Sequence, residues 1–129
     1  MYSGTFTTFK ETLVIAYYYI INADGIIDPK EVAFGERMMK TEKINETDYN
    51  LKLEELKALD HEQLKTILKQ AIKELNTVEQ VKIIAYMSKI ADADGYRDPS
   101  EMISIQDIYS DLHIHLNDII RVKETIELN

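Results

Sequence analysis

One ten-residue pattern occurs twice, 70 residues apart, and it constrains the fold more than any other feature of the chain. The copies run from Asn22 to Glu31 and from Asp92 to Glu101, and both read A-D-G-x-x-D-P-x-E after their first residue. Glycine tolerates the left-handed conformation that ends many helices, so Gly25 and Gly95 are predicted to have positive φ. The Asp, Pro and Glu that follow have the spacing of an N-cap, a first-turn proline and a capping box. Each copy therefore predicts that one helix ends, the chain turns tightly and another helix begins.

Apolar residues recur at helical spacing along the whole chain, and no segment shows the alternation of a strand. We therefore predict an all-α, single-domain fold of about seven helices over residues 1–129. The predicted helices are residues 5–23, residues 29–42, a third opened by Asn45 and Asp48, a fourth opened by a capping box at Asp60, a fifth capped by Thr77, residues 99–112, and a last one opened by Asn117 or Asp118.

Three of these helices carry specific packing expectations. The fifth has almost no polar face, so we predict that it is the buried central helix. The fourth has apolar residues on one side and lysines on the other, which predicts a surface helix lying on the core. Gly35, inside the second helix, costs about 1 kcal/mol relative to alanine, which indicates close approach of a neighbouring helix.

The doubled pattern extends into an internal repeat. At an offset of 70 residues, several positions match on both sides of the pattern, including Ile20 with Ile90, Ile44 with Ile114 and Asp48 with Asp118. Residues 9–59 and 79–129 are therefore predicted to be two copies of a three-helix unit, with the fourth helix as a bridge.

Composition and charge exclude several classes of function. The chain has no cysteine, which removes disulfides, thiolate catalysis and zinc-ribbon sites. Its net charge is −8, and residues 92–129 hold nine acids against three bases, so nucleic acid is a poor partner and a protein with a basic surface is a better one. The apolar run 13–21 is too short to span a membrane, since spanning takes about 20 residues, and we expect a cytoplasmic location.

The two acidic segments resemble a calcium-binding loop in part. When Gly25 is placed on the invariant glycine of an EF-hand, carboxylates fall at the fifth, ninth and twelfth positions. The first position is Ile20, or Ile90 in the second copy, and isoleucine cannot be a ligand. The pattern of a complete EF-hand is therefore missing.

Two interpretations of these segments remain open. Helix capping alone explains Asp28, Glu31, Asp98 and Glu101. It does not explain Asp92 and Asp94, whose charges are unfavourable at the negative end of a helix dipole. The alternative is a weak site for a divalent cation such as calcium, magnesium or manganese. Its candidate ligands are Asp24, Asp28, Glu31, Asp92, Asp94, Asp98 and Glu101.

An all-α chain with paired A-D-G-x-x-D-P-x-E segments, each following an apolar helix, resembles the tellurite-resistance TerB-like family. The same fold also occurs as the N-terminal domain of some membrane-bound DnaJ-type co-chaperones. The resemblance implies a stress-associated helical domain with paired three-helix halves. It also implies a metal-binding acidic cluster, here Asp24, Asp28, Glu31, Asp94, Asp98 and Glu101. The chain departs from the family in Tyr96 and Arg97, where a small or acidic pair is usual.

Other chemistry has little support in the sequence. His113 and His115 are two residues apart, which places them on different sides of a helix and disfavours a shared metal ion. No nucleophile-elbow, metalloprotease or phosphate-loop motif is present, so we expect no enzymatic activity. The first functional hypothesis is a stress-associated module that binds a divalent cation weakly through its paired acidic loops. The second is a metal-independent acidic domain that binds a protein partner, as a co-chaperone or scaffold does.

Overall fold

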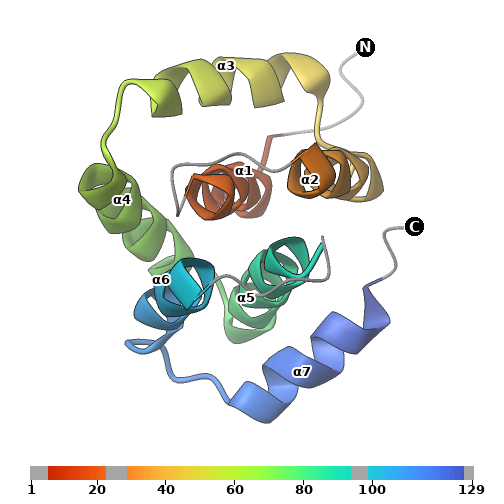
Figure 1. The fold of residues 1–129 in the computed structure, drawn as a ribbon, viewed down its shortest axis with the longest axis vertical. Helices are drawn as coiled ribbons and strands as arrows, with labels where there is room; N and C mark the ends of the chain where they lie inside the picture. Colours follow the sequence, from red (N-terminus) through yellow and green to blue (C-terminus); the bar gives the residue numbers. More distant parts are fainter. Residues whose placement is uncertain (1–5, 23–28, 94–98, 127–129) are drawn as a thin grey trace.

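The computed structural model describes residues 6–22, 29–93 and 99–126, and within these ranges the chain forms seven helices and no strand (Figure 1). The predicted all-α fold is therefore confirmed. The helices are α1 (Thr8–Ile21), α2 (Pro29–Thr41), α3 (Glu46–Lys57), α4 (His61–Lys73), α5 (Thr77–Ala91), α6 (Pro99–Tyr109) and α7 (Leu116–Thr125). In this part of the chain, no helix has both the length and the apolar character needed to cross a membrane.

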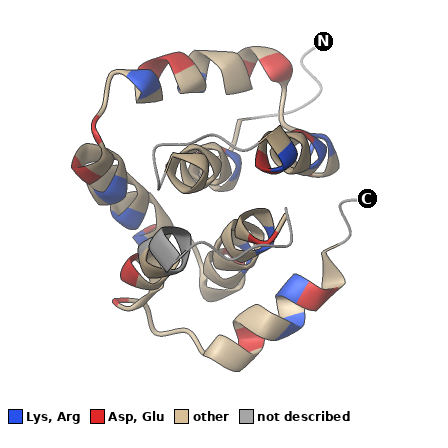
Figure 2. Ribbon diagram, in the orientation of Figure 1, with Lys and Arg blue, Asp and Glu red and all other residues tan. Residues whose placement is uncertain are grey.

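Helices α1 and α5 lie side by side at the centre, and the other five surround them (Figure 1). Both central helices are apolar on nearly all sides, and such helices are stable only when neighbours cover every face. Helices α3 and α4 cover α1, and α6 and α7 cover α5. The outer helices carry most of the charged residues (Figure 2). The prediction of a buried fifth helix is confirmed, and α1 shares that position.

Helix α4 is the predicted surface helix. Leu64, Leu68 and Ile72 form its buried stripe. Two lysines of α4 form ion pairs at the end of α6: Lys65 Nζ lies 3.2 Å from Oδ2 of Asp107 in α6, and Lys69 Nζ lies 2.9 Å from Oδ2 of Asp111, two residues after that helix ends.

The ends of several helices differ from the sequence-based prediction. Thr7 caps α1 through a hydrogen bond from Lys10 N, so that helix begins at Thr8 and not at Thr5. Asn76, and not Thr77, is the N-cap of α5, because its carboxamide accepts from Glu79 N at 2.9 Å while the Glu79 carboxylate accepts from Asn76 N. Helix α6 ends at Tyr109, three residues before the predicted end.

The last helix also begins earlier than predicted. His115 is the N-cap of α7, and its carbonyl oxygen accepts hydrogen bonds from the amides of Asp118 and Ile119. Asn117 and Asp118 therefore lie inside the first turn. The predicted caps Asn45 and Asp60, and the starts of α2 at Pro29 and α6 at Pro99, are confirmed. Gly25 and Gly95 lie outside the described residues, so their positive φ stays a prediction.

A polar contact joins the end of α2 to α5. The Tyr86 hydroxyl donates a short hydrogen bond to the Glu42 carboxylate, and Lys82 Nζ lies 2.9 Å from the same oxygen. Burial raises the pKa of Tyr86, and its hydrogen bond to Glu42 raises the pKa further. The phenol is therefore neutral and keeps its donor role at physiological pH.

At Gly35 the backbone of α2 lies close against the Tyr17 ring of α1. A Cβ built on Gly35 would lie 2.0 Å from Cε1 of Tyr17, whose side chain is buried in the core. Contacts under 3.0 Å are not tolerated by real Cβ atoms, so the Tyr17 ring occupies the space that any other residue would need. The close approach predicted from the glycine is confirmed.

We predict that Gly35→Ala destabilises the protein by about 1–3 kcal/mol, because overpacking the core outweighs the better helix propensity of alanine. Urea denaturation measures the effect. In a double-mutant cycle with Tyr17→Leu, the alanine should cost much less, since the smaller side chain frees the space. An alanine variant as stable as the parent would show that the ring moves aside freely.

The caps provide a second prediction. Asp60→Ala and Asn76→Ala should each reduce the free energy of unfolding by about 1 kcal/mol, since each removes the acceptor of an otherwise unpaired helix amide. Thr77→Ala is the matched control and should have a much smaller effect, because Thr77 is the first helical residue and not the cap. If Thr77→Ala lost more stability than Asn76→Ala, Thr77 would be the N-cap, as the sequence suggested.

Candidate functional site

Most of the predicted acidic site lies outside the part of the chain that the structure describes. Asp24, Asp28, Asp94 and Asp98 fall outside it. Glu101 belongs to α6, but its side chain is also outside the described part. Glu31 and Asp92 are described, and each shows how one of the acidic segments joins the core.

Glu31 lies in the first turn of α2 and is only 3% exposed. Burying an ionised carboxylate costs several kcal/mol, by order of magnitude, unless hydrogen bonds or a cation compensate it. Its charge acts on Tyr17: burial raises the pKa of this phenol well above its usual value, and nearby groups including Glu31 add to the rise. The capping role and the ligand role predicted for Glu31 both supply the compensation that burial demands.

Asp92 is the C-cap of α5, and its backbone N–H donates to the carbonyls of Ser88 and Ile90. Its carboxylate forms a short ion pair with Lys123 Nζ from the last turn of α7. This ammonium offsets the unfavourable position of a carboxylate at the negative end of the helix dipole. A cation at the second acidic segment would therefore compete with Lys123 for Asp92.

The histidines lie elsewhere on the surface. His113 and His115 are both exposed, before and at the N-cap of α7. His61 stacks on Tyr19 with the ring centroids 4.7 Å apart. Among the described residues, no group of three or more His, Asp or Glu side chains is arranged to hold a metal ion.

A second candidate site is an apolar groove between α6 and α7, with α5 as its floor. Three large aliphatic side chains stand on its edges and are strongly exposed: Ile103 at 60%, Leu116 at 57% and Ile120 at 45%. The cavity has a volume of about 350 Å³. It is lined by Ile84, Ser88, Ile103, Ile105, Gln106, Tyr109, Leu116, Ile119, Ile120 and Lys123.

Sequence reasoning did not find this groove. The helical spacing of α6 explains Ile105 and Ile108, which are buried, but not the exposed Ile103. Of the adjacent Ile119 and Ile120 on α7, only Ile119 is buried. The sequence does contain a signal for the groove: α6 and α7 have more isoleucines than one buried face of each helix can hold. Such an excess indicates an apolar surface that a partner could cover.

Lys123 is the one charged side chain among the described residues that line the groove, and its ammonium is paired with Asp92. Ser88, Gln106 and the Tyr109 phenol are the other polar groups of the lining. The groove is thus an aliphatic surface bordered by polar groups, inside a chain whose net charge is −8.

Comparison with known proteins gives one result. A family model described as "Tellurite resistance protein TerB" matches residues 10–124. No curated protein sequence matches the chain. No solved structure matches it either.

Proposed function

Because the chain belongs to the tellurite resistance protein TerB family, we propose that it is a non-enzymatic binding module, whose α6–α7 groove takes up an amphipathic helix from a partner protein. The match to residues 10–124 contains α2 to α6 in full, and α1 and α7 except for Thr8, Phe9 and Thr125. The groove lies within that range. Aliphatic side chains and the Tyr109 phenol line it, and a partner helix could pack against them.

The observation that carries this proposal is the exposure of Ile103, Leu116 and Ile120 around one cavity. Exposed aliphatic residues that border a groove are typical of surfaces that bind the apolar face of a helix. Such a helix places its anchors at positions i, i+3 or i+4, and i+7. A few anchors seated in a groove supply most of the affinity in interfaces of this kind.

The charge of the chain favours a basic partner. A net charge of −8 attracts positively charged proteins over a distance and repels a second copy of the same chain. The apolar groove would supply most of the affinity. The negative electrostatic field of the protein would favour a basic partner and speed its approach. We therefore propose a partner helix with aliphatic anchors and lysine or arginine on its flanks.

A synthetic helix of leucine and lysine, with leucines at i, i+4, i+7 and i+11, tests this proposal. We expect it to bind the protein in a fluorescence anisotropy titration at 0.15 M salt. Ile103→Ser and Ile120→Ser should each weaken binding about tenfold, because each removes an anchor contact. Both residues are exposed, so the variants should keep the stability of the parent.

Two controls make the result specific. Val78→Ser and Leu51→Ser remove exposed aliphatic side chains outside the groove, 78% and 62% exposed, and should leave the affinity unchanged. A peptide with glutamate in place of lysine should bind much more weakly. Equal binding of the glutamate peptide, or equal losses in all four variants, would contradict the groove as the binding site.

We propose a cation site at the acidic segments as a second function, and the observation that favours it is the set of seven carboxylates that the repeated pattern places in two equivalent segments. The proposed ligands are Asp24, Asp28, Glu31, Asp92, Asp94, Asp98 and Glu101. Calcium, magnesium and manganese prefer such oxygen ligands. With an isoleucine at the first loop position and Lys123 bound to Asp92, affinity should be weak, with a Kd of about 10⁻⁴ to 10⁻³ M.

Calorimetry with calcium and with manganese tests the cation site. Asp94→Asn should abolish binding, and Lys123→Met should strengthen it, because the competing ammonium on Asp92 is removed. Arg121→Met is the matched control: it removes the same charge from the same helix, but Arg121 lies near Asp118 and not Asp92. His113→Ala should change nothing. If neither the parent nor any variant binds calcium or manganese at millimolar concentration, the cation site is excluded. Helix binding in the groove then remains as the proposed function.

A further inference from the structure

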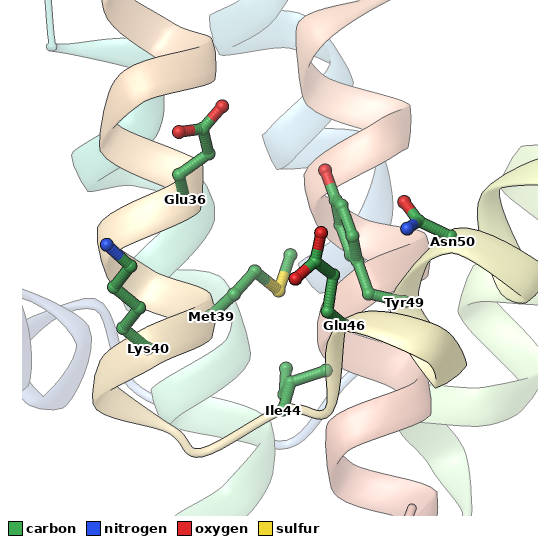
Figure 3. Close-up of a pocket in the computed structure, with 7 residues that line it drawn as sticks. All are labelled: Glu36, Met39, Lys40, Ile44, Glu46, Tyr49 and Asn50. Atoms are coloured by element: carbon green, nitrogen blue, oxygen red, sulfur yellow. The ribbon is translucent and has the colours of Figure 1, made fainter.

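A second cavity, of about 410 Å³, lies between α2 and α3 (Figure 3). Glu36, Met39 and Lys40 line it from α2, Glu46, Tyr49 and Asn50 line it from α3, and Ile44 closes it below from the connection between the two helices. Figure 3 shows Met39 pointing from α2 toward Glu46 and Tyr49. The cavity therefore has walls from two helices and a closed lower end.

This cavity occupies the place in the first half of the chain that the α6–α7 groove occupies in the second. Five of its lining residues, moved by the 70-residue offset of the repeat, fall on lining residues of the groove. The pairs are Glu36 with Gln106, Met39 with Tyr109, Glu46 with Leu116, Tyr49 with Ile119 and Asn50 with Ile120. Polar or charged residues thus replace aliphatic ones on the α3 wall, so the two cavities are suited to different ligands.

The lower part of the cavity is apolar and the upper part is charged. Met39 is 6% exposed and Ile44 is 9% exposed, and both belong to the hydrophobic core. The carboxylates of Glu36 and Glu46 are exposed, and neither forms an ion pair with any residue in the described part of the chain. Tyr49 lies beside Glu46 (Figure 3), and its phenol is neutral because burial raises its pKa and the charge of Glu36 adds to the rise, although a hydrogen bond with Tyr17 lowers the pKa in part.

We propose that the α2–α3 cavity binds a primary alkylammonium group, either of a free aliphatic amine or of a lysine side chain on a partner. The aliphatic stem would lie on Met39 and Ile44, and the ammonium would be near the Glu36 and Glu46 carboxylates. An ammonium group has three donors and no acceptor, which matches two carboxylates and a phenol oxygen. The cavity has several times the volume of a four-carbon stem, so the ligand would keep part of its hydration.

The charge of Lys40 should affect amine binding in the opposite direction from the two glutamates. Its ammonium lines the same cavity and opposes a cationic ligand. Removing that charge should therefore strengthen the binding of an amine, while removing Glu36 or Glu46 should weaken it. Residues with a merely structural role would not give opposite effects of this kind.

The test uses the whole chain and follows the methionine methyl groups by ¹³C NMR during titration with cadaverine. The Met39 methyl should shift in a saturable manner with a millimolar Kd, and the fully buried Met38 and Met87 methyls serve as internal references. Glu36→Gln and Glu46→Gln should each weaken binding about threefold, as expected for the loss of one exposed ion pair. Lys40→Gln should strengthen it by a similar factor. Glu62→Gln and Lys73→Gln, exposed on α4, are the matched controls.

Saturation at Met39 with opposite effects of the acid and lysine variants would establish the site. A linear, unsaturated shift, or an equal loss in Glu62→Gln, would show only general attraction to an acidic protein and would overturn the proposal. A parallel titration with a short peptide containing one lysine identifies the source of the amine. Tighter binding of the peptide indicates a partner side chain, and tighter binding of cadaverine indicates a free amine. The α6–α7 groove plays no part in this titration. The outcome of the titration is therefore independent of the function proposed above.

Discussion

The contact between α1 and α5 is the constraint on which the rest of the structure depends. Each of these helices is buried on nearly every side, with Leu13, Tyr17 and Ile20 on one and Ile83, Met87 and Ile90 on the other. A helix without a polar face is unstable in water until all its sides are covered. Two such helices in contact cover only one side each, and the five outer helices are arranged to cover the remainder. The tight approach of α2 at Gly35 and the lysine pairs of α4 are consequences of that demand.

Local sequence signals predicted the parts of the fold that depend on neighbours in the chain. The capping box at Asp60, the cap at Asn45 and the prolines that open α2 and α6 involve residues at most four positions apart, so their geometry is nearly independent of the remaining structure. The errors have the same origin. Asn76 and Thr77 are adjacent and both suited to capping, and which of them caps depends on the register of a single helical turn.

Features that join distant elements could not be predicted in this way. The ion pair between Asp92 and Lys123 spans 31 residues, and nothing in either local pattern indicates it. The exposure of Ile103 and Ile120 depends on how far α6 stands from α7, which hydrophobic spacing does not determine. The sequence located the acidic segments, but their relation to α7 and the nearby groove required the tertiary structure.

Lys123 links the two functions proposed for the second half of the chain. Its ammonium neutralises Asp92, at the start of the second acidic segment, and its side chain lines the apolar groove. A cation that took Asp92 from Lys123 would leave an uncompensated positive charge beside the groove, where it would repel the lysines of a basic helix. Thermodynamic linkage requires the reverse effect to be equally large: a basic helix bound in the groove would lower the affinity for the cation by the same factor. Under the two proposed functions, binding at one site would therefore oppose binding at the other.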